Sequence, residues 1–298
     1  MKSFAMTPVD YRLLRGADDM PLGVYQLHLT TAEQLCKLHY SPKSIKWVQK
    51  RLKLLADNGY LNVDAYVMKR RSQKGKVYFI PHSYYILSSK GIRYLEGIGL
   101  DIATSMRARD KDRDSLFVEH TLEINDLLIA AMLLKRVNPR YYLRGFIHEH
   151  DWRRVPLKTH SVAIIPDAYL DLRVQTADNR TRRLSLLLEH DCGTEEQHRF
   201  RRRIQGYVEL LKTGAYRERL QTRSVTIAFT TFIGQKRLEQ MRDWTREQLL
   251  ATCEQPSMMS SFVFAAFDKP LDPCHVWLEP SWYTLLTRQQ RIALLHEG

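Results

Sequence analysis

One segment of this chain, KSIKWVQKRLKLLADNGYL at residues 43–61, constrains the fold more than any other because helix-boundary signals stand at both of its ends. Ser41 and Pro42 precede it, and these residue types favour the N-cap and the first position of a helix. Asn58 and Gly59 follow its last apolar residue, and glycine suits the left-handed position that ends a helix. The two signals predict a helix of defined length here.

This helix has two different faces. Apolar residues recur at helical spacing and are expected to face a core: Ile45, Val48, Leu52 and Leu55. Polar and basic residues fall on another face and are candidates for contact with DNA: Lys43, Lys46, Gln49, Lys50 and Lys53. A shorter helix at residues 31–40, which Thr30 or Thr31 can cap, precedes it across a tight turn. The two helices form a helix-turn-helix pattern.

A basic hairpin follows the second helix. Strand-like residues 61–68 and 77–88 flank the turn KRRSQKGK, and a last helix near residues 91–100 ends the module. The turn supplies further candidates for contact with DNA: Lys69, Arg70, Arg71, Lys74 and Lys76. A lysine-striped second helix followed by such a hairpin is typical of a winged helix-turn-helix domain that binds duplex DNA.

The charge distribution supports a nucleic-acid partner. The chain has a formal net charge of +13 and a pI of about 9.6. Thirteen basic residues against three acids lie between Thr31 and Arg93, so the excess is concentrated in the predicted winged helix. Because basic side chains release counterions from phosphates, this region is expected to bind double-stranded DNA. The alternative, a winged helix that binds protein, is disfavoured by the same charge.

Several classes of protein are excluded or disfavoured. The sequence lacks an apolar run long enough for a membrane span, and its first residues lack the apolar core of a secretory signal. Its four cysteines form no CxxC pair, which predicts neither a disulfide framework nor a zinc site. A phosphate-binding GxxxxGK[ST] loop is absent as well. We expect a cytoplasmic protein that does not interact with membranes.

The length of 298 residues predicts two domains. Residues 1–100 are assigned to the winged helix-turn-helix and residues 101–115, rich in opposite charges, to a linker. Residues 116–298 are assigned to a second domain. This domain is predicted to begin with a long helix at 116–137 and to continue in the order strand, strand, strand, helix, strand, helix. The expected fold class is α+β or α/β, with a mixed sheet flanked by helices.

Four motifs in the second domain resemble a known family. They are HTLEIND, the Pro166-Asp167-Ala168 turn, LLLEHDCGTE and a following R-x-x-G-Y helix. Placed behind a winged helix, they resemble the bacterial replication-relaxation family of plasmids and other mobile elements. The resemblance implies a restriction-endonuclease-like fold of the PD-(D/E)xK type and a role in replication, mobilisation or their control. The resemblance is compatible with a homodimer, and with partners among the proteins of replication, transfer or transposition.

The resemblance makes Asp167 and Glu189 candidate ligands of a catalytic Mg²⁺. Such a nuclease holds the ion with carboxylates from neighbouring strands, and these two acids fall in adjacent strand segments. An additional acid could come from Glu119, Glu123 or Glu149, of which Glu149 is taken as the candidate metal ligand.

The third position of the nuclease motif departs from the pattern. A lysine is expected two residues after Glu189, but the chain has Asp191 there. Residues two apart on a strand share a face, so both acids point the same way and Asp191 becomes a further metal candidate. Arg203 or Arg199 on the next helix could replace the missing cation, and Arg203 is taken as the candidate catalytic residue.

The residues leave three functions open. One is a DNA-binding protein that acts in replication, mobilisation or transcriptional control. Another is an active Mg²⁺-dependent nickase that uses Asp167, Glu189 and Asp191. The third is an adaptor that recruits proteins through a silent nuclease fold, in which case Asp167 is a turn acid and the other two end a strand.

The sequence His148-Glu149-His150 partly resembles a metal site of the relaxase kind. On a strand the two histidines would share a face. The motif of that class has an apolar residue between the histidines, and this chain has Glu149 there and no identifiable third histidine. The pattern therefore does not favour a relaxase, and Glu149 is interpreted as an acid near Asp167 instead.

Overall fold

A computed structural model describes residues 19–71, 77–100, 102, 115–159, 161–252, 256–287 and 290–296. The described residues form two compact units: an N-terminal unit up to Ile129 and a C-terminal unit from Ala130 onward. The division falls inside α5 (Ser115–Met132), whereas the sequence placed the start of the second domain at residue 116. Most of the predicted linker lies outside the described residues.

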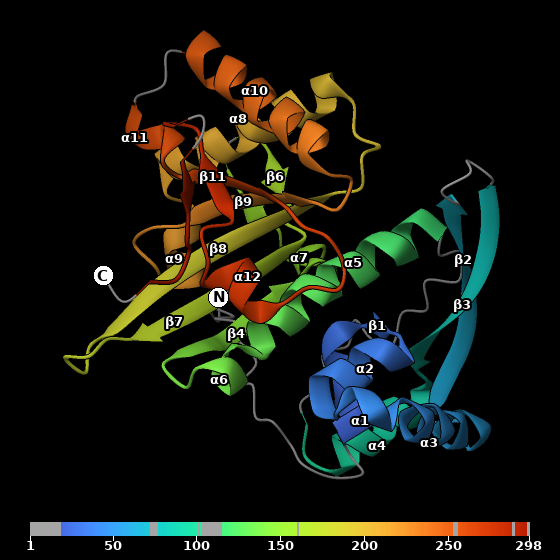
Figure 1. Ribbon diagram of the computed structural model, residues 1–298. Helices are drawn as coiled ribbons and strands as arrows, with labels where there is room; N and C mark the ends of the chain where they lie inside the picture. The colour runs from blue at the N-terminus through green and yellow to red at the C-terminus, as the bar shows by residue number, and fades with distance from the viewer. Residues whose placement is uncertain are drawn as a thin grey trace. The chain divides into compact units, whose positions relative to one another are not determined.

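The N-terminal unit combines helices with a small antiparallel sheet of order β1-β3-β2 (Figure 1). Besides most of α5 it contains α1 (Asp19–Leu27), β1 (Leu29–Thr30), α2 (Ala32–His39), a 3-10 turn (Pro42–Ser44), α3 (Ile45–Asp57), β2 (Leu61–Arg71), β3 (Val77–Leu87) and α4 (Ser89–Gly97). The two predicted helices and the predicted hairpin are all present. The elements α1 and β1 were not predicted.

Local signals explain the boundaries of these helices. The side chain of Thr31 accepts a hydrogen bond from the backbone N–H of Gln34, and the Gln34 side chain accepts one from the N–H of Thr31, which caps α2. Gly59 follows α3 with φ at 73°, as a left-handed terminating residue does. Thr31 and Gly59 therefore act where the sequence placed them. The predicted start signal Ser41-Pro42 instead opens the 3-10 turn without a side-chain cap, and α3 begins at Ile45.

The predicted apolar stripe of α3 faces the core of the N-terminal unit. Val48 and Leu52 are fully buried, and Ile45 and Leu55 pack at the edge of the same core. The first part of α5 also belongs to this unit, because Asn125 donates hydrogen bonds to backbone oxygens at both ends of the turn between α1 and β1. The second domain therefore does not begin with this helix as a whole.

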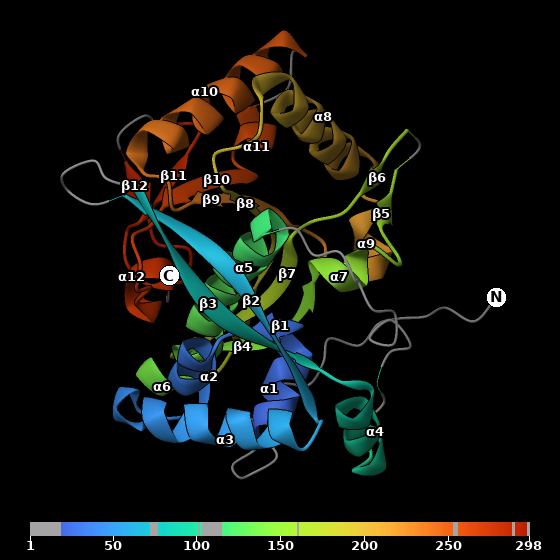
Figure 2. The ribbon, with the colours of Figure 1, turned by 90° about the vertical axis from the view of Figure 1, so that its right-hand side faces the viewer.

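The C-terminal unit is built on a seven-stranded mixed sheet of order β12-β11-β10-β9-β8-β7-β4 (Figure 2). Its strands are β4 (Tyr141–His148), β7 (Ala168–Gln175), β8 (Thr181–Asp191), β9 (Thr226–Thr231), β10 (Phe262–Ala266), β11 (Trp282–Thr284) and β12 (Arg291–Ile292), with β5 (Leu157–Lys158) and β6 (Ala163–Ile164) as a separate pair. Its helices are α6 (Leu134–Val137), α7 (Glu149–Trp152), α8 (Gln197–Thr213), α9 (Tyr216–Leu220), α10 (Gln235–Ala251), α11 (Pro256–Met259) and α12 (Pro273–Trp277).

The strand directions bring five strand ends to one edge of this sheet. β4, β7 and β8 are antiparallel neighbours, whereas β8, β9 and β10 are parallel. The ends of β4, β8, β9 and β10 and the start of β7 therefore lie together. In mixed sheets of this kind, ligand sites occur at the carboxyl ends of the parallel strands.

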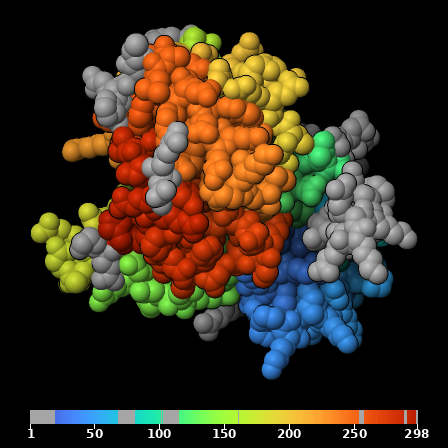
Figure 3. All heavy atoms as spheres, turned by 45° about the horizontal axis from the view of Figure 1, so that its top comes forward, coloured from blue at the N-terminus to red at the C-terminus, as the bar shows by residue number. Residues whose placement is uncertain are grey.

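Two helices cover one face of the sheet. Figures 1 and 2 both show α8 and α10 side by side above the strands, and Figure 3 shows the surface of α10 and of the residues that follow it. Phe200 and Tyr207 of α8 pack in one buried core with Leu187 of β8 and Phe229 of β9. Because alternate residues of a strand share a face, Glu189 and Asp191 point with Leu187 toward these helices.

The interpretation of His148, Glu149 and His150 as one strand is wrong. The strand ends at His148, and residues 149–152 form the short helix α7. The His148 Nδ1 atom accepts a hydrogen bond of 3.5 Å from the backbone N–H of His150, so His148 caps this helix. The two histidines therefore do not present a shared strand face.

None of the helices among the described residues combines the length and the apolar character needed to cross a membrane.

Candidate functional site

Four acids named from the sequence lie at the sheet edge where the strand ends meet. Glu189 and Asp191 occupy the end of β8, Asp167 comes directly before β7, and Glu149 directly after β4. The strand register pairs Ala168 with Leu188 on one side and with His148 on the other. Asp167 therefore lies between Glu149 and Glu189 across three neighbouring strands.

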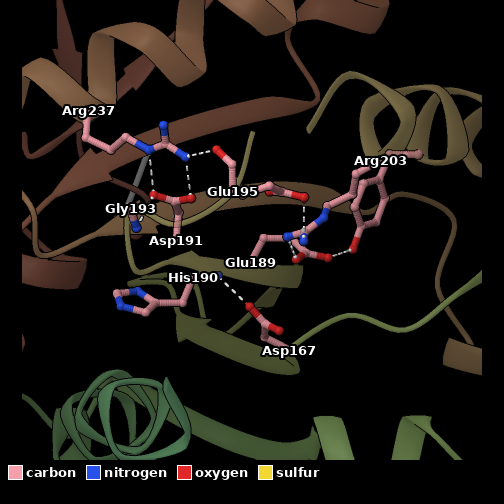
Figure 4. A network of polar contacts seen from close by, with 9 residues as sticks. Asp167, Glu189, His190, Asp191, Gly193, Glu195, Arg203 and Arg237 are labelled. Carbon is pink, nitrogen blue, oxygen red and sulfur yellow. Dashed lines mark hydrogen bonds and ion pairs between the residues drawn. The ribbon is translucent and has the colours of Figure 1, made fainter. Parts of the chain in front are cut away.

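Asp167 forms the centre of this group. Its buried side chain accepts a hydrogen bond of 2.6 Å at Oδ2 from the backbone N–H of His190 (Figure 4). A carboxylate oxygen of Glu149 lies within 4.8 Å of one from Asp167. Glu149 also accepts from Arg153 at 2.7 Å. The two acids are close enough to act together on a cation.

Glu189 is held by two residues of α8. Arg203 donates to Glu189 Oε2 at 2.6 Å, and the Tyr207 hydroxyl donates to Oε1. These are the arginine and the tyrosine of the R-x-x-G-Y motif. The glycine of this motif, Gly206, packs closely against Ile164 of β6. The motif thus provides both partners of the Glu189 carboxylate.

Burial dominates the protonation of Glu189. It raises the pKa of this carboxyl to about 8, because the loss of hydration and the nearby charge of Asp167 outweigh the stabilisation by Arg203 and Tyr207. Burial likewise raises the pKa of Tyr207, and the charge of Glu189 adds to that effect. The carboxylic acid form of Glu189 is therefore accessible at neutral pH.

Arg203, and not Arg199, meets the site. Its guanidinium bridges Glu189 and Glu195, the latter at 2.9 Å, whereas the Arg199 side chain is exposed. Burial lowers the pKa of Arg203, but the charges of Glu189, Asp167 and Glu195 raise it above its ordinary value. Arg203 therefore supplies a permanent positive charge next to Glu189, whereas the position that holds lysine in the nuclease motif is occupied by Asp191 in this chain.

Asp191 is engaged by Arg237 of α10, which the sequence did not suggest. The Arg237 guanidinium donates to both carboxylate oxygens at 2.7 Å, and the N–H of Gly193 donates to Oδ2 at 2.8 Å (Figure 4). Arg237 also donates to the backbone oxygen of Glu195 at 2.8 Å. One signal could have indicated it: Arg237 stands four residues before Met241, on the buried face of α10.

His190 lies between the two acids of β8 in sequence, but its side chain has other partners. Its Nδ1 atom lies 2.9 Å from the Thr230 hydroxyl, and its ring contacts Phe232 with a centroid distance of 4.6 Å. The Thr230 hydroxyl also donates to the backbone oxygen of Glu189. These contacts fix the end of β8 against β9.

The donor atoms divide into two groups with respect to a metal ion. Both carboxylate oxygens of Asp191 are bound by Arg237, and both of Glu189 are bound by Arg203 and Tyr207. Asp167 and Glu149 bring carboxylate oxygens within 4.8 Å of each other, and Mg²⁺ typically takes one or two protein carboxylates and completes its shell with water and phosphate. Asp191, a ligand candidate from the sequence, is instead held by Arg237.

The candidate DNA-contacting residues of α3 are at the surface. The side chains are exposed at Lys43, Lys46, Gln49, Lys50 and Lys53. Lys53 pairs with Asp57 at 3.0 Å, whereas within the described part of the chain no acid pairs with Lys43, Lys46 or Lys50. The backbones of Lys69, Arg70 and Arg71 belong to β2, and Lys74 and Lys76 lie outside the described residues.

Comparison with known protein families gives a match over two thirds of the chain. Residues 23–226 match the sequence model of a family described as replication-relaxation. This range includes α2, α3, the β2–β3 hairpin and all four acids of the sheet edge. No curated protein and no solved structure matches the chain.

Proposed function

Because the chain belongs to the replication-relaxation family, we propose that it is a DNA-binding protein of a plasmid or another mobile element. In this proposal it acts in replication, in mobilisation or in transcriptional control at a site that its N-terminal unit recognises. The expected partner is double-stranded DNA, and proteins of replication, transfer or transposition are expected to act at the same site.

The exposed lysine face of α3 is the observation that carries this proposal. The order α1, β1, α2, α3, β2, β3, with the sheet order β1-β3-β2, supports the proposal of a winged helix in which α3 would be the recognition helix. Lys46 and Lys50 project from this helix and Lys43 from the 3-10 turn before it, and no acid of the described residues competes for them. Such cations supply the salt-dependent part of DNA binding.

Substitution of two of these lysines tests the proposal. We expect Lys46→Ala combined with Lys50→Ala to weaken binding to duplex DNA about tenfold or more, and to reduce the slope of log affinity against log salt by roughly 2. The double substitution Lys135→Ala and Lys158→Ala removes the same charge from exposed positions of the C-terminal unit and serves as the control. Equal binding by both double variants would contradict a role for α3.

A second candidate function is that of a Mg²⁺-dependent endonuclease. The acid pair Asp167 and Glu149 favours it, because this pair lies next to Glu189 on neighbouring strands, as the nuclease fold requires. Asp167 and Glu149 would hold the ion, which would neutralise charge on a scissile phosphate. In this candidate Arg203 replaces the lysine of the family motif, and Asp191 holds α10 in place.

Plasmid nicking distinguishes this candidate from a silent nuclease fold. Supercoiled DNA that carries the flanking sequence of the gene is incubated with wild type, with Asp167→Asn or with Glu149→Gln, in Mg²⁺ or in EDTA. Nicking that requires Mg²⁺ and is lost in both variants, but not in the exposed-acid control Glu218→Gln, would support the endonuclease. If the plasmid stays intact and the variants shift its mobility as the wild type does, the protein is a DNA-binding adaptor with a silent nuclease fold.

A further inference from the structure

A large aromatic side chain is exposed at the edge of the lysine face of α3. Trp47 is 51% exposed, although α3 buries Val48 and Leu52 completely. Its ring contacts that of Tyr40, with ring centroids 5.1 Å apart at an interplanar angle of 64°. This edge contact holds one side of the indole and leaves the rest accessible. The accessible part of the indole therefore offers an apolar surface to a partner that contacts this side of α3.

Most neighbours of Trp47 on this surface are cations. Positions three and four residues apart are adjacent on a helix, which places Lys50 and Arg51 of α3 beside the indole, with Lys43 and Ser44 of the preceding 3-10 turn on its other side. The partner of this surface must therefore offer negative charge together with an apolar group. A second copy of this chain would bring like charges together, and a purely apolar protein surface would leave the lysines unpaired.

The major groove of duplex DNA offers this combination. Phosphates line both of its walls, and each thymine presents its C5-methyl group on the groove floor, where apolar side chains contact it. We propose that Trp47 contacts thymine methyl groups in the major groove, so that α3 prefers sites containing A·T pairs at that position. This inference rests on the proposed DNA binding by α3 and adds a source of sequence preference to it.

The two kinds of side chain then have separate roles. Contacts of lysines with phosphates depend on salt and carry no sequence information. A contact of the indole with a methyl group is insensitive to salt and depends on the base. Removal of Trp47 is therefore expected to reduce the discrimination between DNA sequences while the salt dependence stays the same.

Replacement of thymine by deoxyuridine tests the inference, because it removes only the methyl groups and keeps every phosphate. A duplex is first selected from a randomised pool by the wild-type protein, and is then synthesised with thymine or with deoxyuridine. We expect the wild type to bind the thymine duplex about three- to tenfold more tightly. Trp47→Ala should bind both duplexes equally with an unchanged salt slope, and Trp47→Phe should retain the preference.

The control for this variant is Leu250→Ala, which removes an exposed apolar side chain from α10 and should keep the preference. Equal binding of both duplexes by wild type, or a preference that persists in Trp47→Ala, would overturn the inference while DNA binding stands. A selected duplex without a required thymine would overturn it as well. Failure of the wild type to bind any duplex would instead overturn the proposed function.

Discussion

The end of β8 and the surface of α3 are both rich in charge, but they use it in opposite ways. At β8 each arginine meets a carboxylate, and the acids are buried beneath α8 and α10. On α3 the lysines are exposed and, at Lys43, Lys46 and Lys50, the described residues provide no acid partner. The comparison teaches that paired, buried charge specifies the fold, whereas unpaired, exposed charge is available to a partner.

The largest effect on stability is expected at Arg237. Arg237→Ala leaves the Asp191 carboxylate buried without its two donors, which we expect to lower the free energy of unfolding by about 3–5 kcal/mol. Urea denaturation followed by circular dichroism measures this change. Lys236→Ala removes the adjacent exposed cation and should change stability by less than about 0.5 kcal/mol. Equal losses in the two variants would contradict the contrast between paired and unpaired cations.

The next effect concerns pH. Because the pKa of Glu189 is raised to about 8 from an ordinary value of 4.5, the folded state retains a proton that the unfolded chain has lost between these values. The free energy of unfolding should therefore fall as pH rises from 5 to 8, on the order of 2–3 kcal/mol, and level off above pH 8. Burial raises the pKa of Glu195 too, which adds an effect of the same sign.

Glu189→Gln isolates the contribution of that carboxyl. In metal-free buffer we expect its stability to decrease less between pH 5 and 8 than that of the wild type, as measured by urea denaturation at fixed pH values. If the free energy of unfolding of variant and wild type changed in parallel across this range, Glu189 would already be ionised at pH 5. It would then form an ordinary ion pair with Arg203.

A smaller effect is expected at Tyr207. Tyr207→Phe removes the hydroxyl that donates to Glu189 and keeps the packing of the ring, so we expect a loss of about 1–2 kcal/mol. Tyr142→Phe, at a half-buried position of β4, is the matched control and should have little effect. Thermal unfolding of both variants gives the comparison. An unchanged Tm for Tyr207→Phe would mean that Arg203 alone satisfies the Glu189 carboxylate.

The smallest effect is expected on α3. Lys46→Ala combined with Lys50→Ala should leave the free energy of unfolding within about 0.5 kcal/mol of wild type, because neither lysine has a partner among the described residues. Calorimetry measures this directly. A clear loss of stability would indicate that these lysines support the fold, and would remove the contrast with the end of β8.

The sequence predicted the elements whose signals are local. The helix at residues 45–57 carries its boundary residues and its apolar stripe within one segment, and β8 is a continuous apolar run that ends in acids. The missed α1 contains Pro21 and Gly23, which disfavour a helix prediction. Short strands such as β11 and β12 depend on pairing, of β11 with β10 and of β12 with β11, which no local pattern shows.

The candidate site was predictable to a similar extent. Asp167 and Glu189 follow from motif resemblance, and Arg203 follows from its place on the next helix. The role of Arg237 did not follow, because it depends on the packing of α10 against the end of β8. For the same reason the sequence could not show that Arg237 binds both oxygens of Asp191.

The two arginine contacts at the end of β8 differ in the length of chain that they close. Arg203 reaches Glu189 across 14 residues, whereas Arg237 reaches Asp191 across 46. Contacts between distant residues form late in folding because more chain entropy must be lost first. We therefore expect Asp191 to remain hydrated until α10 docks. The contact of Arg237 with Asp191 would then affect the unfolding rate more than the folding rate, and so determine the lifetime of the native state.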